Sequence, residues 1–304
     1  MRLASAALAI ACGFAANGKQ TFRSGVEAVR VDVLVMDGNR PVGGLSAPDF
    51  ELRDSGVVQP IESVAIEDVP LNVMLALDTS ESVDGAPLQD LKQAALAVVR
   101  LLRPDDRAAL ITFNDYVTLR AGWTAESRQL ELAISQTKAA GATALHDAAY
   151  SSLTLRHTRP GRTLALLFSD GDDTASWLPG DTVLDIARRN EVVVYAVEKR
   201  RDSWRPGYRV DFHSGLQTGV ANVDRKALDE RFLIALAEET GGQYLRAARS
   251  GSLRETFVKI INEFRTRYLL TYTPRGVDAG GWHPLEVKLK GRKGTVTARR
   301  GYLK

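Results

Sequence analysis

The sequence predicts an α/β fold: a doubly wound, mostly parallel sheet inserted into a small β-sandwich formed by both chain ends. Between residues 71 and 266, apolar runs of strand length alternate with helical patterns, the order that produces a parallel sheet covered by helices. Strand-like alternation occurs before residue 70 and again after residue 267. The segment 267–304 carries nine basic and two acidic residues, whereas 1–70 carries six basic and nine acidic ones. Opposite charges therefore favour pairing of the two end segments.

The composition is that of an ordinary globular protein. The chain has 304 residues, of which 44% are hydrophobic and 25% charged, and it has one cysteine. These values exclude a disordered, collagen-like or disulfide-rich protein. The net charge is only +3, so binding of nucleic acid through bulk charge is not expected.

The N-terminal segment predicts export. Residues 3–16 are small or apolar and follow a single Arg2, the pattern of a signal peptide, which we place at 1–16. This run is too short to span a bilayer, so no transmembrane segment is expected. A lipid anchor at Cys12 and a simple N-terminal helix stay open as alternatives. The expected location is periplasmic, cell-surface or secreted.

The two parts of the predicted fold are assigned from these patterns. Valines alternate with other residues over 29–35 and lead into a turn at Asp37-Gly38, which indicates a half-buried strand. The β-sandwich is assigned to residues 26–70 plus 267–304, and the α/β domain to 71–266. In the latter, strands are expected at 71–77, 107–113, 116–119, 163–168, 192–197 and 243–247, and helices at about 88–102, 126–138, 145–157, 181–189, 227–240 and 252–266.

Three oxygen-rich segments follow or connect the predicted strands. Asp78-Thr79-Ser80-Glu81-Ser82 follows the first strand, Ser169-Asp170-Gly171 follows the strand that begins at Thr163, and Gly141-Ala142-Thr143 leads into a helix. Ligands of open α/β sheets bind at the carboxyl ends of the strands. Carboxylates and hydroxyls without His or Cys suit a hard cation. We expect Mg²⁺, with Mn²⁺ or Ca²⁺ as alternatives.

These three segments resemble the metal-ion-dependent adhesion site of von Willebrand factor type A (VWA) domains. The resemblance covers about residues 71–266 and includes all five metal-site positions. It implies that Ser80, Ser82 and Thr143 bind the ion directly or nearly so. It also implies that Asp78 and Asp170 hold the ion through water or directly.

The flanking sequence extends the resemblance. VRVDVLVMDGNRPVGGLSAPDFELRDSG upstream, with RYLLTYTP and VTARRGY downstream, is similar to a bacterial VWA-related family described from acidobacteria. Its members are exported and mostly uncharacterised, so this likeness concerns architecture more than biochemistry.

The expected function is metal-dependent protein binding without catalysis. Hydroxyl ligands leave the ion with residual positive charge and an exchangeable position, which an Asp or Glu carboxylate of a partner protein can fill. Glu81 is read as a solvated loop residue, and Asp172 and Asp173 as capping or turn acids. His146 is read as structural or solvated, and the histidine spacing gives no zinc site.

The connection 199–226 is long for a compact domain and follows a strand on the expected metal side. Its Trp204 and Tyr208 lie among basic residues, which suits contact with an acidic partner. A solvated insertion is the equal alternative.

Two other functions stay open. A Mg²⁺-dependent phosphotransferase or phosphatase of the haloacid-dehalogenase type needs an Asp two residues after its nucleophile, where this chain has Ser80. A structural VWA protein whose metal is dispensable is the second alternative. We also expect Asp78→Ala and Asp170→Ala to abolish metal binding without disturbing the fold.

Overall fold

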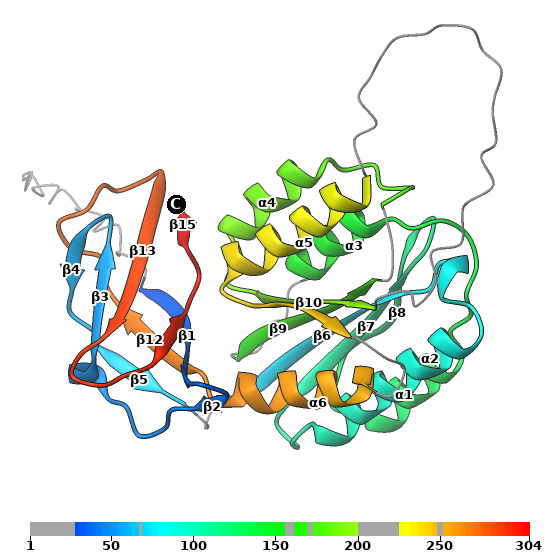
Figure 1. Cartoon of the computed structure of the whole chain (residues 1–304), viewed down its shortest axis with the longest axis horizontal. Coiled ribbons are helices and arrows are strands. Elements are labelled where there is room, and N and C mark those ends of the chain that lie inside the picture. The colour runs from blue at the N-terminus through cyan, green and yellow to red at the C-terminus, as the bar shows by residue number, and fades with distance from the viewer. Residues whose placement is uncertain (1–27, 67–68, 156–160, 170–172, 200–224, 248–251) are drawn as a thin grey trace, which may run out of the picture.

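The structure of the chain is a computed structural model that describes residues 28–66, 69–155, 161–169, 173–199, 225–247 and 252–304. Two units lie side by side, an α/β unit and a smaller β unit (Figure 1). The predicted signal peptide at 1–16, Asp170, Asp172 and nearly all of the 199–226 connection lie outside the described residues. Among the described residues, no helix is long and apolar enough to cross a membrane.

The α/β unit contains a six-stranded sheet in the order β11-β10-β9-β6-β7-β8. Its strands are β6 (Leu71–Asp78), β7 (Arg107–Phe113), β8 (Val117–Thr124), β9 (Arg162–Ser169), β10 (Val193–Lys199) and β11 (Tyr244–Ala247). Neighbouring strands are parallel except β8, which is antiparallel to β7. The mostly parallel α/β sheet predicted from the sequence is therefore confirmed.

Helices cover both faces of this sheet (Figure 1). One face packs against α1 (Ala86–Leu101), α2 (Ser127–Ser135) and α6 (Ser252–Arg265). The other packs against α3 (Leu145–Thr154), α4 (Gly180–Arg188) and α5 (Arg225–Thr240). All eight residues of β6 are buried, as expected for a central strand covered on both sides.

The order of strands reverses next to β6, because the chain passes from β6 to β7 on one side and later returns to β9 on the other. The segments that follow β6 and β9 therefore leave the sheet side by side at its carboxyl edge. Such a reversal is where open α/β sheets bind ligands. The topology thus brings the oxygen-rich segment after β6, which begins at Asp78, next to the one after β9, which begins at Ser169.

The β unit contains strands from both ends of the chain. One sheet has the order β14-β1-β12-β5, with β2 paired to β1, and the other has the order β15-β13-β3-β4. The strands are β1 (Val29–Asp37), β2 (Arg40–Pro41), β3 (Phe50–Asp54), β4 (Val57–Gln59), β5 (Ser63–Ala65), β12 (Tyr268–Tyr272), β13 (Trp282–Leu289), β14 (Thr295–Thr297) and β15 (Gly301–Leu303). Side chains of both sheets share one hydrophobic cluster. Strands from before residue 70 thus pair with strands from after residue 267.

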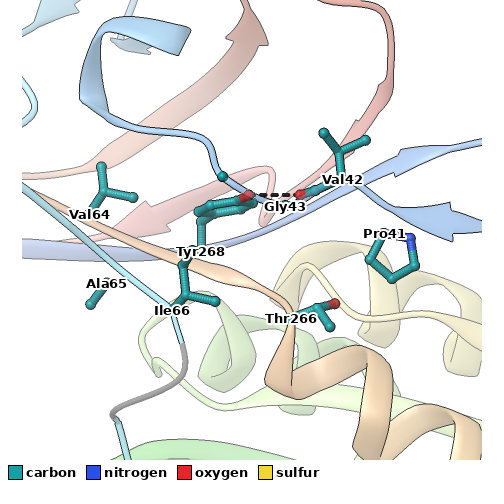
Figure 2. A pocket seen from close by; sticks show the side chains of 9 residues that line it. Pro41, Val42, Gly43, Val64, Ala65, Ile66, Thr266 and Tyr268 are labelled. Atoms are coloured by element: carbon teal, nitrogen blue, oxygen red, sulfur yellow. Dashed lines mark hydrogen bonds between the residues drawn. The ribbon is translucent and has the colours of Figure 1, made fainter.

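A hollow of about 630 Å³ lies in the β unit beside the junction of α6 and β12 (Figure 2). The Tyr268 hydroxyl crosses it and donates to the Val42 carbonyl at 2.7 Å. Its other lining residues are small, apolar or uncharged: Pro41, Gly43, Gly44, Val64, Ala65, Ile66 and Thr266. Among the described residues, no charged side chain lines it, so those residues offer no ligand set for a cation.

Three elements have a boundary that differs from the sequence prediction by three residues or more. The helix expected at 126–138 ends at Ser135. Just beyond this end, the Thr137 hydroxyl donates a hydrogen bond to the Ile134 carbonyl at 2.7 Å. The helix expected at 145–157 ends at Thr154. The strand expected at 116–119 begins at Val117 and continues to Thr124. Its added residues stay paired with β7 through two shifts in register.

Candidate metal centre

Asp78 lies at the carboxyl end of β6 and is completely buried. Its Oδ1 accepts a hydrogen bond from the Ser80 backbone N–H at 2.9 Å, which fixes the turn after the strand. Its Oδ2 accepts from the Ser169 hydroxyl at 2.8 Å, which ties the end of β9 to the end of β6. Asp78 is therefore part of the packed structure, because its carboxylate joins two strand ends inside the protein. That Asp78→Ala keeps the fold stays a prediction.

Ser80 and Ser82 place two hydroxyl oxygens together. Ser80 is 2% exposed, whereas Ser82 lies on the surface in the short 3-10 helix at Glu81–Val83. Their Oγ atoms are 2.9 Å apart. Adjacent ligands of an octahedral Mg²⁺ at about 2.1 Å from the metal are separated by about 3.0 Å. The two serines are therefore spaced as neighbouring ligands of one ion would be.

The loop that carries Thr143 is tied to the segment after β6 by backbone hydrogen bonds. The Ala140 N–H donates to the Thr79 carbonyl at 2.9 Å, and the Glu81 N–H donates to the Gly141 carbonyl at 3.0 Å. Thr143 is buried. These bonds hold the oxygen-rich segment 141–143 against the segment 78–82.

Gly141 allows this close approach. Its φ is +78°, and a Cβ there would lie 1.8 Å from a carboxylate oxygen of Asp115, so no other residue fits without rearrangement. Asp115 Oδ1 also accepts from the Ala142 N–H at 3.1 Å. Asp115, which follows β7, supports the Thr143 loop. Sequence reasoning did not single it out, because nothing along the chain links it to residue 141.

Thr174 and Ala175, which follow the third oxygen-rich segment in the sequence, also bond to the backbone of Thr143. The Thr143 carbonyl accepts from the N–H groups of Thr174 and Ala175 at 2.8 and 3.0 Å. The Thr143 N–H donates to the Thr174 hydroxyl at 3.0 Å. Asp170 itself lies outside the described residues, directly after Ser169, whose hydroxyl bonds to Asp78. Four of the five predicted ligand positions thus belong to segments that hydrogen-bond to one another.

The loop 173–178 caps the N-terminus of α3. Asp173 accepts from the Leu145 N–H at 2.8 Å, and the Ser176 hydroxyl accepts from the His146 N–H at 2.9 Å. The reading of Asp173 as a capping acid is confirmed. The Asp147 carboxylate in turn accepts from the N–H groups of Trp177 and Leu178, both at 3.0 Å. The helix that follows Thr143 is therefore locked to the segment that follows Asp170.

His146 lies between two carboxylates. Its Nδ1 is 3.7 Å from Asp173, and its Nε2 is 3.6 Å from Asp229 of α5. Its ring meets the Phe232 ring edge-on at 4.4 Å between centroids. Burial lowers the pKa of His146, but Asp229 and Asp173 raise it by more, so its pKa lies above the ordinary value. His146 is structural, as expected, and the role of Asp229 was not foreseen.

Two aromatic side chains stand out from this end of the unit. Trp177 is 89% exposed although its backbone is fixed by Asp147, and Tyr116, in the turn between β7 and β8, is 74% exposed. Their loops flank the Thr143 loop, because Asn114 accepts from the Ala144 N–H at 2.8 Å and Thr174 donates to Thr143. Exposed aromatic groups of this kind are typical of protein interfaces.

The donor set of the site is made of hydroxyl and carboxylate oxygens. Among the residues that the structure describes, no group of three or more His, Cys, Asp and Glu side chains could hold a metal. A cation at this edge would therefore depend on the serine and threonine hydroxyls as well as on carboxylates. Oxygen donors of this kind fit Mg²⁺, Mn²⁺ or Ca²⁺ better than a soft metal.

The fold and this edge of the sheet define a class: a doubly wound α/β domain with an oxygen-rich metal-type site at its topological switch point. The family model of the von Willebrand factor type A domain matches residues 73–172. The chain therefore contains a VWA domain. An uncharacterized protein of Synechocystis sp. is 39% identical over 85 residues, which cover 26% of this chain. The chain spans 19% of that curated relative's length.

Solved structures agree with this assignment at the level of the fold. A von Willebrand factor type A protein from Catenulispora acidiphila has a TM-score of 0.53 at 13% identity, with 89% of this chain and 76% of that chain covered. Proximal thread matrix protein 1 from the mussel byssus, with a zinc-occupied MIDAS motif, has a TM-score of 0.51 at 15% identity. It covers 69% of this chain and 49% of the other. At such identities, the likeness concerns the fold alone.

Proposed function

We propose that this protein is a metal-dependent protein-binding module of the adhesion type, with Mg²⁺ as the ion. Ser80, Ser82 and Thr143 would bind the ion directly or nearly so, and Asp78 and Asp170 would hold it through water or directly. The observation that carries this proposal is the 2.9 Å spacing of the Ser80 and Ser82 hydroxyls in a loop fixed by Asp78. The zinc-occupied MIDAS motif of the mussel protein supports a divalent ion in this fold.

The partner would be a protein that presents an Asp or Glu carboxylate. Neutral hydroxyl ligands leave much of the charge of the ion uncompensated, so a partner carboxylate can complete its coordination in a charge-assisted bond. Trp177 and Tyr116 would contact the partner beside that carboxylate, since both are exposed on loops that flank Thr143. Binding would then need both the ion and an apolar contact.

A non-enzymatic role fits the site better than phosphoryl transfer. The haloacid-dehalogenase type of mechanism needs a general acid two residues after its nucleophile. Ser80 occupies that position, and its hydroxyl contacts Ser82. VWA domains are in general interaction modules, which agrees with this choice.

The β unit and the N-terminal segment complete the proposal. The two sheets built from both chain ends, with their shared cluster, support a small β-sandwich into which the VWA domain is inserted. The apolar run at 3–16 supports export by a signal peptide. The protein would then act in the periplasm, at the cell surface or outside the cell.

The test is the melting temperature of the protein, from residue 17 onward, in EDTA and in Mg²⁺ or Mn²⁺. An ion at about 100 times its Kd stabilises the folded state by about 2.7 kcal/mol, and each kcal/mol raises the midpoint by roughly 2–4 °C for domains of this size. We expect a rise of several degrees that Ser80→Ala abolishes and that Ser63→Ala, an exposed serine of β5, retains. An unchanged midpoint in both metals would contradict a preformed metal site.

A further inference from the structure

A second candidate site lies between the α/β unit and the β unit. A cleft of about 480 Å³ is lined by the starts of β1, β9 and β10, the ends of α3 and α4, and β15. Because β6, β9 and β10 are parallel, their starts lie at the sheet edge opposite the metal-type residues. This cleft is therefore separate from the candidate metal centre. Clefts at such domain junctions commonly bind small molecules.

The lining of this cleft is strongly basic. Five cations line it, and Glu191 is the one acidic residue among the described residues that do so; the cations are Arg30, Arg188, Arg189, Arg299 and Lys304. Glu191 is neutralised by its ion pair with Arg30, and Arg188 pairs with Asp185 and Glu239. Among the residues that the structure describes, Arg189, Arg299 and Lys304 have no ion pair. The five cations and the three carboxylates that pair with them thus leave a net charge of +2 around one cavity.

Arg299 is the central group of this set because it is only 8% exposed. Its Nε donates to the Gly301 carbonyl at 2.7 Å, and one terminal nitrogen donates to the Arg188 carbonyl at 2.9 Å. These bonds fix the plane of the guanidinium, but both acceptors are neutral. A buried charge without a counterion is costly. Burial accordingly lowers the pKa of Arg299, although Glu191 and Glu239 act to raise it.

The remaining walls of the cleft are apolar. Leu153 and Leu155 come from the end of α3, and Tyr302 and Leu303 come from β15. A guanidinium held in one plane binds a carboxylate with two parallel hydrogen bonds. Apolar walls beside it favour a ligand with a hydrocarbon body rather than a bare inorganic ion.

We infer that this cleft binds a small organic anion, with its carboxylate on Arg299 and Arg189 and its apolar body against Leu153, Leu155 and Tyr302. The ligand joins α4 to β15 and therefore bridges the two units. This site is independent of the metal ion and of the protein partner proposed above.

Titration calorimetry with 4-phenylbutyrate tests the inference. The experiment uses the whole protein at constant ionic strength with EDTA present, so that no carboxylate can bind through a metal ion. Inorganic phosphate serves as the probe for charge alone, and 4-phenylbutanol as the probe for the apolar body alone. We expect saturable binding of one phenylbutyrate per chain, with phosphate and phenylbutanol each bound at least about tenfold more weakly.

Variants assign the binding to these residues. Arg299→Gln and Arg189→Glu are each expected to weaken phenylbutyrate binding about tenfold or more, which is the loss of one charge-assisted hydrogen bond. Arg189 is exposed, so Arg189→Glu decides the question if Arg299→Gln does not fold. The matched control is Arg128→Glu, which makes the same charge change at an exposed arginine of α2 and should bind phenylbutyrate as the unchanged protein does.

Four outcomes would overturn the inference. An absence of saturable binding in the calorimeter would show that the cleft is not a binding site. Phenylbutanol binding as tightly as phenylbutyrate would remove the need for an anion, and phosphate binding as tightly would remove the need for an apolar body. Equal weakening by Arg128→Glu and Arg189→Glu would show attraction to bulk charge instead of a site.

Discussion

Asp78 serves the candidate site and the fold at once. Its carboxylate is completely buried and accepts hydrogen bonds from Ser80 and Ser169. A side chain that only held an ion would be replaceable without loss of stability. Because Asp78 also connects the ends of β6 and β9, we expect its removal to be costly even when no metal is present.

The pair Asp78→Ala and Ser82→Ala separates these roles. In EDTA, Asp78→Ala should lower the free energy of unfolding by about 2 kcal/mol or more, since a hydrogen bond to a charged group contributes about 1.5–3 kcal/mol. Ser82 is exposed, so Ser82→Ala should change that free energy by less than about 0.5 kcal/mol. Both should lose the stabilisation by Mg²⁺. Urea unfolding with and without metal measures both effects, and equal stability of the two variants in EDTA would refute the double role of Asp78.

At the scale of elements, His146 connects three segments around the site. It lies on α3, Asp173 lies on the loop after β9, and Asp229 lies on α5. Its folded pKa is raised above the unfolded value of about 6.5. Stability from this contact is therefore fully present below about pH 6.5 and is lost as the pH rises through the folded pKa.

NMR titration of the His146 ring in EDTA tests this sign. The midpoint should lie above about 6.5, and Asp229→Asn should lower it, whereas Asp181→Asn, an exposed acid of α4, should not. The difference in unfolding free energy between the protein and His146→Gln should shrink from pH 5 to pH 9. A ring that titrates below the ordinary histidine value would contradict the role given to the two carboxylates.

The helices and strands themselves were largely predictable from the sequence, whereas the contacts between distant residues that hold the site in place were not. The apolar run of β6 and the oxygen-rich residues after it depend on local pattern, and a parallel sheet then requires that they meet the end of β9. The contacts of Gly141 with Asp115 and of His146 with Asp229 join residues distant along the chain. No periodicity encodes such pairs. For the same reason, the buried Asp54, which binds Tyr272, Tyr302 and His283, was not foreseen.

At the scale of the whole molecule, Arg162 joins the two units. It is buried at the start of β9, and its Nε donates to Asp32 of β1 at 2.7 Å. Its terminal nitrogens donate to the carbonyls of Phe264 and Arg267, both at 3.1 Å. Both connections between the units therefore contact this one residue, since the backbone N–H of Arg162 also donates to the Pro70 carbonyl at 3.0 Å.

Replacement of this arginine should weaken the whole molecule. Arg162→Met should lower the free energy of unfolding by about 3–5 kcal/mol, because it leaves Asp32 and several carbonyls without their buried partner. Arg107→Met, at the same edge of the sheet on β7, should cost no more than about 1 kcal/mol. Among the described residues, the Arg107 side chain bonds to the nearby carbonyls of Pro104 and Asp106. Scanning calorimetry compares the two variants, and similar losses would argue against a special role for Arg162.

The insertion of the α/β unit between β5 and β12 has a mechanical consequence. These two strands are paired neighbours, so the chain enters and leaves the α/β unit at the same place. A tensile load applied to a partner on the metal face would pass into β5 and β12 at once. The hydrogen bonds between these two neighbouring strands would share it. Arg162 would resist separation of the two connecting segments under this load, because it bonds to Pro70 on one and to Phe264 and Arg267 on the other.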